Sequence, residues 1–319
     1  MLDRQPMQNE LIMQRSPLPH MPFTFDITGW ITMPAHWFTD KRSRLPRSTT
    51  LTLILSLLIA PALLLSPAAW SADAEKEAAK PAEVRAAVAA NFTAAMKELG
   101  AAFTAKTGHP VVSSFGASGQ LVAQIANGAP FDIMLAADNQ YTVQLVEKGL
   151  GVGDSRFVYA QGKLALWSAS AGVVDTKGQV LKDGKFEKIA VANPKLAPYG
   201  RAAEQTLQAL GLFDKLQPRF VTGENIGQTQ QFVASGSVPL GFIALAQVYA
   251  LPEAQRGSFW IVPADLYQQL DQEAVLLKSA EQNVPAKAFL AFLKSPEAQD
   301  IIRKFGYELP GSPTANTSK

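Results

Sequence analysis

Short apolar runs alternate with amphipathic stretches from residue 84 onward. The run 84–90 is almost wholly apolar, which predicts a buried strand, and Gly108 ends the helical spacing that follows it. The apolar residues at that spacing are Phe92, Ala95, Met96, Leu99 and Phe103. Two more strand–helix pairs follow, with strands expected at 110–115 and 131–137. Alternation of this kind predicts a parallel sheet with helices on both faces.

A second set of elements occupies the middle of the chain. Its expected strands are 188–192, 219–221 and 239–243, and its expected helices are 201–210 and 226–234. Further strands are expected at 157–159, 164–167, 260–262 and 273–277, and closing helices at 286–293 and 296–305. The periodicity lapses at 171–186, where glycines and charged residues indicate a loop at a domain boundary.

Together these elements predict an α/β protein with two lobes, each a mostly parallel sheet flanked by helices. The second lobe, 164–257, is inserted into the first, which comprises 84–163 and 258–319. The strand segments near 157–167 and 258–277 then cross between the lobes. Two crossover strands form a hinge, and a ligand can bind in the cleft between the lobes.

Residues 1–74 differ from the rest of the chain. A basic cluster at 41–47 precedes an apolar run at 51–65 and then small residues up to Ala74. This order is typical of a secretory signal peptide, and the run is short for a membrane span. Cleavage is expected after Ala74, with Ser71 as the second choice, and an uncleaved anchor is the alternative. Residues 75–83 are then a charged, alanine-rich linker.

Composition narrows the possible partners. The formal net charge is +2 at pH 7, with 29 Lys and Arg against 27 Asp and Glu, so no basic field favours nucleic acid. There is no cysteine, which excludes disulfides, thiol nucleophiles, cysteine–metal sites and a lipid-modified cysteine.

Four strand-to-helix junctions stand out. They are Ala90–Phe92, Ala117–Gly119, Pro198–Gly200 and Asn225–Gly227. In open α/β sheets ligands bind at the carboxyl ends of the strands, which is where these helices begin. Their N–H groups and partial positive charge can hold a small anion without lysine or arginine. The alternative is that they are ordinary helix caps, with Asn91 and Ser118 at N-cap positions.

Ser118 could instead be the nucleophile of a secreted serine hydrolase. Such a serine needs a base, and His109 is the one histidine after residue 74. His109 directly follows a glycine that ends a helix, which favours a structural role. The segment 116–119 also lacks the ending of a nucleotide-binding P-loop.

Charged residues near the junctions offer further chemistry. Asp132 and Asp138 flank one strand and could pair for metal or acid–base work, but a strand edge and a helix cap are favoured. Arg201 and Glu224 could steer a ligand or bridge the lobes, although solvated surface charges are favoured. We therefore expect no metal site and no catalytic residue.

Several segments together resemble the periplasmic molybdate-binding proteins of ABC transporters. They are VAANFTAAM at 88–96, VSSFGASGQ at 112–120, GAPFDI at 128–133, AAD at 136–138, ANP at 192–194, APYG at 197–200, GENI at 223–226, PLGFI at 239–243 and KFGY at 304–307. The resemblance covers about 84–308 and implies the two-lobed periplasmic binding protein fold and a periplasmic location. It implies molybdate or tungstate as the ligand, a membrane permease as the partner and no cofactor. We expect a monomer.

The resemblance also implies which residues bind the anion. They are Asn91, Ser118, Tyr199, Ile226 and, as a further candidate, Ala90. The first two are expected to donate from side chain and backbone, and the others from backbone N–H groups. One familiar form of the family has a tyrosine donor where Ala244 stands here, and a serine where Asn91 stands. The two N–H donors of the Asn91 amide are expected to compensate.

The predicted function is capture of molybdate and tungstate for import by an ABC transporter. A first alternative keeps the fold and binds another oxyanion, such as sulfate or thiosulfate. A second is the hydrolase that uses Ser118, and a third is a sensor module that shares the binding fold without a role in transport.

Overall fold

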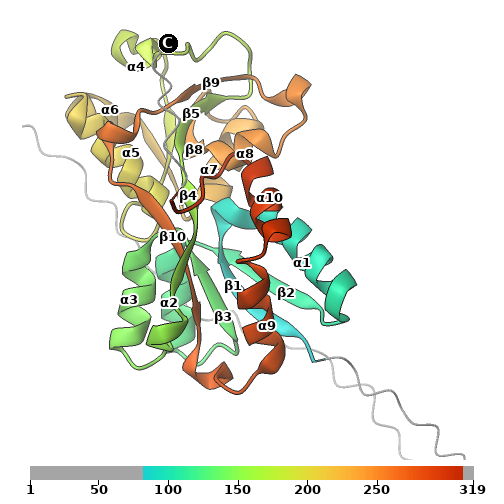
Figure 1. Ribbon diagram of the computed structural model, residues 1–319. Helices are drawn as coiled ribbons and strands as arrows, with labels where there is room; N and C mark the ends of the chain where they lie inside the picture. Colours follow the sequence, from blue (N-terminus) through green and yellow to red (C-terminus); the bar gives the residue numbers. More distant parts are fainter. Residues whose placement is uncertain (1–81, 312–319) are drawn as a thin grey trace, which may run out of the picture. The chain divides into compact units, whose positions relative to one another are not determined.

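The computed structural model describes residues 82–311, which belong to one compact unit (Figure 1). The predicted leader at 1–74, with its apolar core at 51–65 and its cleavage site, lies outside the described residues. So does nearly all of the predicted linker at 75–83. Within 82–311, no helix is long and apolar enough to cross a membrane.

Two five-stranded sheets form the two lobes of the described residues. The first lobe has the strand order β2-β1-β3-β10-β4, and the second has β7-β6-β8-β5-β9. The strands of the first are β1 (Val84–Ala89), β2 (Val111–Gly116), β3 (Ile133–Ala136), β4 (Phe157–Gly162) and β10 (Leu270–Leu276). Those of the second are β5 (Leu164–Ser168), β6 (Ile189–Ala192), β7 (Phe220–Gly223), β8 (Gly241–Ala244) and β9 (Ser258–Ile261). The predicted two-lobed α/β fold is confirmed.

One strand in each sheet runs against its neighbours. In the first lobe β10 is antiparallel to β3 and β4, and in the second β5 is antiparallel to β8 and β9. Both strands connect the lobes: β5 follows β4 after the single residue Lys163, and β10 follows β9 (Figure 1). The parallel strands end at the cleft, so a strand that enters a lobe from the cleft must run in the opposite direction.

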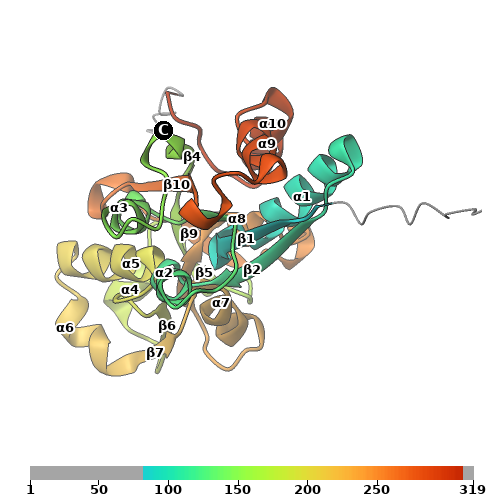
Figure 2. The ribbon, with the colours of Figure 1, turned by 90° about the horizontal axis from the view of Figure 1, so that it is seen from below.

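Helices cover both faces of the first sheet. They are α1 (Thr93–Thr107), α2 (Ser118–Ala126), α3 (Asn139–Glu147), α9 (Val284–Phe292) and α10 (Pro296–Lys304). Along β1, Ala86 and Val88 pack in the cluster under α1, α9 and α10, whereas Ala87 packs under α2 and α3 (Figure 2). The alternation follows from the pleat of the strand, and it explains why β1 is apolar on both sides.

The second lobe contains three short helices that the sequence pattern did not predict. Its helices are α4 (Gln179–Asp183), α5 (Pro198–Ala209), α6 (Phe213–Leu216), α7 (Ile226–Ala234) and α8 (Leu245–Tyr249). The predicted domain boundary at 171–186 is wrong, because this segment contains α4 and connects β5 and β6 of the same sheet. Helices of four or five residues show too few turns for a recognisable period.

The observed helix ends confirm two of the predicted caps and contradict two others. Gly108 ends α1 in the left-handed conformation, and the Asp138 side chain accepts the Tyr141 N–H at the start of α3, both as predicted. Asn91 is not a cap: it lies inside a 3-10 turn, η1 (Ala90–Phe92), and α1 starts after Phe92. Nor is Ser118 a cap, because Ala117 holds that position and Ser118 is the first residue of α2.

Candidate functional site

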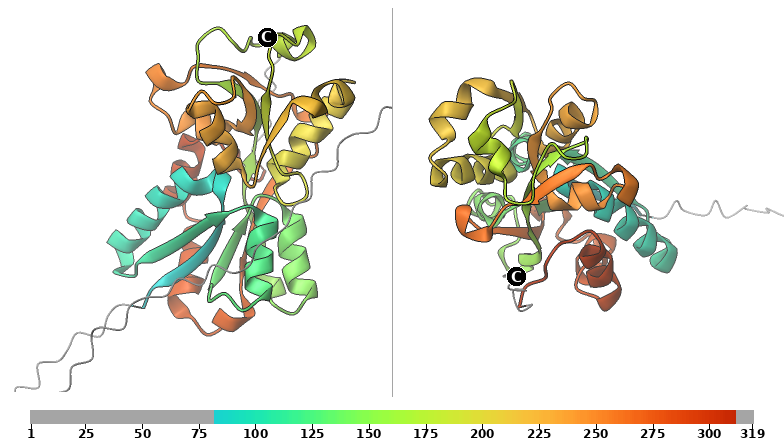
Figure 3. Two further views of the ribbon diagram at one scale, coloured as in Figure 1. Left: turned by 180° about the vertical axis from the view of Figure 1, so that it is seen from behind. Right: turned by 90° about the horizontal axis from the view of Figure 1, so that it is seen from above.

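The strand register of each lobe brings its helix starts together. Ala89 of β1 pairs with Gly116 of β2, so the starts of η1 and α2 lie side by side. In the second sheet Ala192 pairs with Gly223, which places the segments before α5 and α7 next to each other. Seen from behind, α1 and α2 begin at the junction of the two lobes (Figure 3). Four helix starts therefore face one cleft.

A small cavity lies where these four starts meet. It is lined by Ala89, Ala90, Asn91, Gly116, Ala117, Ser118, Ala137, Ala197, Pro198, Tyr199 and Ile226. All five residues predicted to bind the anion are among them. No lining residue carries a charge, and the helix starts contribute partial positive charge to the cavity.

Ser118 is arranged to donate into the cavity. Its side chain accepts the Ala137 N–H at 3.0 Å, which leaves the hydroxyl proton for another acceptor. The next N–H, of Gly119, is bonded to Leu196 O of the second lobe at 3.0 Å. The first residue of an α-helix has no intrahelical acceptor for its N–H, so Ser118 offers two donors.

The second lobe offers backbone donors. Pro198 begins α5 and has no N–H, so Tyr199 supplies the first donor of that helix. In α7 the Asn225 side chain accepts the N–H groups of Gly227 and Gln228, at 2.9 and 3.1 Å. This cap leaves the N–H of Ile226, the first helical residue, without an intrahelical partner.

Asn91 is placed differently from the prediction. Its side chain is buried, with 3% of the residue exposed, and its Nδ2 donates to Gln272 Oε1 at 2.9 Å and Tyr307 OH at 3.0 Å. Both amide hydrogens are thus occupied inside the first lobe, and the predicted side-chain donor to an anion is absent in this arrangement. The Oδ1 atom is buried and is the one side-chain polar atom of residues 82–311 found buried without a hydrogen-bond partner.

Sequence reasoning missed the polar network behind Asn91. Gln272 of β10 is fully buried; its Oε1 also accepts from Tyr159 OH at 3.0 Å, and its Nε2 donates to Tyr199 OH at 3.1 Å. Tyr307 OH donates to Asn91 O at 2.9 Å. Burial raises the pKa of Tyr159, Tyr199 and Tyr307, so each hydroxyl keeps its proton. The sequence offered little signal, because Gln272 lies between two acidic residues in β10.

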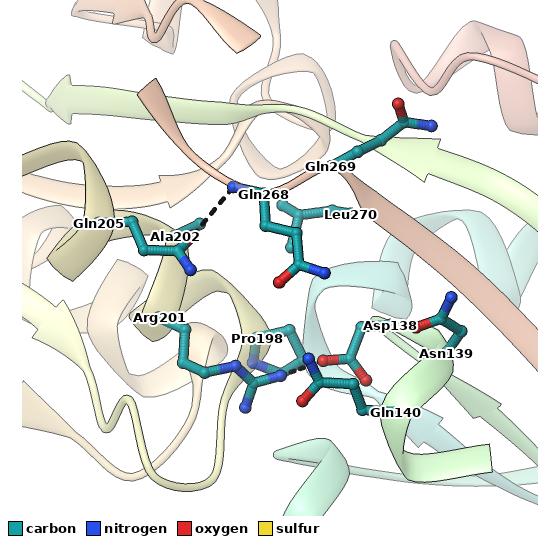
Figure 4. Close-up of a pocket in the computed structure, with 10 residues that line it drawn as sticks. All are labelled: Asp138, Asn139, Gln140, Pro198, Arg201, Ala202, Gln205, Gln268, Gln269 and Leu270. Carbon is teal, nitrogen blue, oxygen red and sulfur yellow. Dashed lines mark hydrogen bonds and ion pairs between the residues drawn. The ribbon is translucent and has the colours of Figure 1, made fainter. Parts of the chain in front are cut away.

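An ion pair joins the lobes beside the cavity. The Arg201 guanidinium of α5 bonds the Asp138 carboxylate (Figure 4). It also lies 5.5 Å from the centre of the Tyr141 ring. Burial raises the pKa of Asp138, while Arg201 and the N–H groups of Tyr141 and Gln140 act in the opposite direction. The predicted solvated surface charge at Arg201 is therefore wrong, and the alternative of a bridge between lobes is correct.

Comparison with known proteins agrees with this geometry. Residues 84–308 match the model of a family described as bacterial extracellular solute-binding proteins. The chain belongs to this family. The molybdate-binding protein ModA of Rhodobacter capsulatus is 52% identical over 225 residues, which are 70% of this chain and 88% of that protein. ModA of Azotobacter vinelandii is 49% identical over 232 residues, or 73% and 92% of the two chains.

A solved structure is also similar to this chain. The periplasmic molybdate-binding protein of Azotobacter vinelandii superposes with a TM-score of 0.68 at 42% identity, covering 71% of this chain and 99% of that one. The resemblance inferred from the sequence segments is confirmed by these relatives. As a family member, this protein has a solute-binding role in the periplasm as part of an ABC transporter.

The structure also shows where the other residues suggested by the sequence lie. Ala244 is fully buried at the end of β8 and is not among the residues that line the cavity. His109 Nδ1 lies 2.9 Å from Ala82 O, and the Ser118 side chain bonds Ala137 N, so the pair needed by a hydrolase is not assembled. Asp132 accepts the Arg85 N–H at 2.7 Å, while Glu224 is exposed. Among residues 82–311 no cluster of acidic, histidine or cysteine side chains could hold a metal ion.

Proposed function

We propose that this protein captures molybdate, and tungstate equally, in the periplasm and delivers it to the membrane permease of an ABC transporter, without performing chemistry. The observation that carries the proposal is the uncharged cavity at which four helix starts meet. Relatives about half identical in sequence, both named as molybdate-binding proteins, support the choice of anion.

The anion-binding residues in this proposal are Asn91, Ser118, Tyr199 and Ile226, with Ala90 as a further donor. Two N–H groups from the second lobe and the hydroxyl and N–H of Ser118 surround the anion from both sides of the cleft. Charge-assisted bonds of this kind are stronger than neutral ones, and each anion oxygen needs a donor in a buried site. Binding therefore favours the closed arrangement of the lobes, since neither lobe alone completes the shell.

Selectivity follows from fixed donors around a fixed volume. Molybdate and tungstate are nearly alike in size and larger than sulfate, so sulfate would make longer and weaker bonds. Phosphate carries a proton at neutral pH. Once the Asn91 amide donates to the anion, the cavity presents donors only and leaves that proton without an acceptor. We expect tight binding of both metal oxyanions and weak binding of sulfate and phosphate.

A thermal-shift series tests the proposal. The protein from residue 75 onward is heated with molybdate, tungstate, sulfate, thiosulfate or phosphate. A ligand of the native state stabilises it by RT ln(1 + [L]/Kd), about 4 kcal/mol at a thousandfold excess over Kd. Stabilisation by molybdate and tungstate only is the expected result. Stabilisation by sulfate or thiosulfate alone would favour the other oxyanion class, and hydrolysis of a generic ester that is lost in Ser118→Ala would favour the hydrolase.

The chain organisation that accompanies this function is also a proposal. It comprises a cleaved leader at 1–74, a linker at 75–83, a first lobe at 84–163 and 258–319, a second lobe at 164–257, and a monomeric mature protein. N-terminal mass spectrometry of the exported protein tests the cleavage site, and its sedimentation with and without molybdate tests the monomer.

A further inference from the structure

Asn91 presents the wrong atom for an anion site. The cavity has Asn91 in its wall, yet both Nδ2 hydrogens are bonded to Gln272 and Tyr307 away from it. What remains unpaired is Oδ1, a buried acceptor with no donor. An acceptor in the wall would repel an oxyanion, whereas the other end of the same amide would bind one. In the arrangement seen here, the Asn91 side chain therefore offers an anion no donor.

Gln272 controls which end of the Asn91 amide is available. Its Oε1 accepts from both Asn91 Nδ2 and Tyr159 OH, while its Nε2 donates to Tyr199 OH. As long as Oε1 faces Asn91, the Asn91 amide must turn Nδ2 toward it. The two amides can change only together, because a carbonyl oxygen must always face an N–H across the 2.9 Å contact.

Rotation of both amides by 180° gives a second network that keeps the other heavy-atom contacts but loses the bond between Asn91 and Tyr307, because Tyr307 OH donates its one proton to Asn91 O and has none for Oδ1. Gln272 Nε2 then donates to Asn91 Oδ1 and to Tyr159 OH, and Tyr159 OH donates to Ala136 O, already 3.3 Å away. Tyr199 OH, which only accepts in the first network, donates to Gln272 Oε1. The unpaired Oδ1 disappears, and Asn91 Nδ2 becomes a free donor at the cavity.

We propose that Gln272 is a positioning residue for anion binding: it rotates together with Asn91, and an anion in the cavity selects the network in which Asn91 Nδ2 donates to it. The proposal rests on the proposed function, since it needs an oxyanion in this cavity. It also connects the anion to the second lobe, because Gln272 lies on the crossover strand β10 and bonds Tyr199 of α5.

Gly162 leaves room for the side chains of Gln272 and Tyr199. A Cβ at Gly162, the last residue of β4, would lie 2.6 Å from Gln272 Nε2 and still closer to Tyr199 OH. Only glycine allows the Gln272 and Tyr199 side chains to meet at this crossover. The absence of a side chain at Gly162 of β4 thus leaves room for the contact between Gln272 and Tyr199, which joins the lobes.

The test is a double-mutant cycle on molybdate affinity, measured by calorimetry for the wild type, Asn91→Ala, Gln272→Met and the double variant. Gln272→Met alone is expected to raise Kd about tenfold, because Asn91 loses the partner that orients it. In the Asn91→Ala background the same change is expected to raise Kd by less than about threefold. Equal effects in both backgrounds would overturn the proposal, since Gln272 would then not act through Asn91.

Two controls separate the possible failures. Thr142→Val removes another fully buried hydroxyl that bonds Glu273, the neighbour of Gln272, and should lower stability without changing Kd. In the wild type, the side-chain NH₂ signals of Asn91 and Gln272 are also recorded by NMR during a molybdate titration. This measurement tests the coupled rotation even if Gln272→Met does not fold. Both pairs of signals should shift on addition of molybdate. An unmoved Gln272 signal in a wild type that binds molybdate contradicts this inference alone, whereas no binding by the wild type contradicts the proposed function.

Discussion

The two lobes contribute to the cavity by different means. In the proposed site the first lobe supplies two side chains, those of Ser118 and Asn91, besides the Ser118 N–H, whereas the second lobe supplies only the N–H groups of Tyr199 and Ile226. A side-chain donor can rotate or be exchanged, and its partners decide where it points. A backbone donor is fixed by the helix and by caps such as Asn225. In the proposed site the second lobe is therefore the rigid half, and the first lobe is the adjustable half.

The largest effect is expected from removing a rigid donor. Ile226→Pro deletes the N–H at the first position of α7, where proline fits and where the preceding Asn225 is already extended. The loss of one bond to a buried anion should cost about 2–3 kcal/mol, roughly a 30- to 150-fold rise in the Kd for molybdate. Ile226→Ala keeps the N–H while it shortens the side chain, and calorimetry should show a much smaller change. Equal losses in the two variants would mean that this N–H does not bind the anion.

Removal of the adjustable donor comes next. Asn91→Ala should weaken molybdate binding by about 1–3 kcal/mol, because one anion oxygen loses its partner. Urea unfolding without ligand should show a separate loss, since Gln272 and Tyr307 also lose a hydrogen-bond partner. An unchanged Kd would remove Asn91 from the site and would leave Ser118 as the first lobe's only side-chain donor.

A moderate effect is expected where the lobes touch. A Cβ at Gly119 would lie 2.9 Å from Tyr141 OH and 3.2 Å from Leu196 Cα of the second lobe. Gly119→Ala should therefore disfavour the closed arrangement and raise Kd about three- to tenfold. Gly128→Ala, two residues after the end of α2, strains a residue with φ of 84° but meets no neighbouring atom, so it should lower stability without changing affinity. X-ray scattering should show a more open Gly119→Ala protein, and identical curves would contradict this role.

The smallest effect on affinity is expected at the ion pair. Arg201 bonds Asp138 across the lobes but does not line the cavity, so Arg201→Ala should raise Kd less than about fivefold. Because Arg201 lowers the pKa of Asp138, which burial raises, the variant should move that pKa further upward in a carboxyl ¹³C NMR titration. A hundredfold loss of affinity, about 2.7 kcal/mol, would mean that a cation is needed and that uncharged donors do not suffice.

Much of the fold could be predicted from the sequence, for a physical reason that differs between elements. The local spacing of apolar residues predicts long helices and buried strands. The helices α1 and α7 and the strand β1 were therefore expected close to their observed bounds. The short helices α4, α6 and α8 have no detectable period and were missed. The function of the 171–186 segment was misjudged because a polar stretch gives no sign of which sheet its flanking strands join.

The sequence by itself determined the four helix starts and their composition, because caps, prolines and first-turn N–H groups depend on residues a few positions apart. Tertiary structure decided what those starts do. Asn91 meets Gln272 across 181 residues and Tyr307 across 216, Tyr199 meets Gln272 across 73, and Arg201 meets Asp138 across 63. No local pattern encodes contacts at such separations, and the direction in which the Asn91 amide points depends on all of them at once. The residues of the candidate site were thus readable from the chain, whereas the hydrogen-bond state of its adjustable half is a property of the folded molecule.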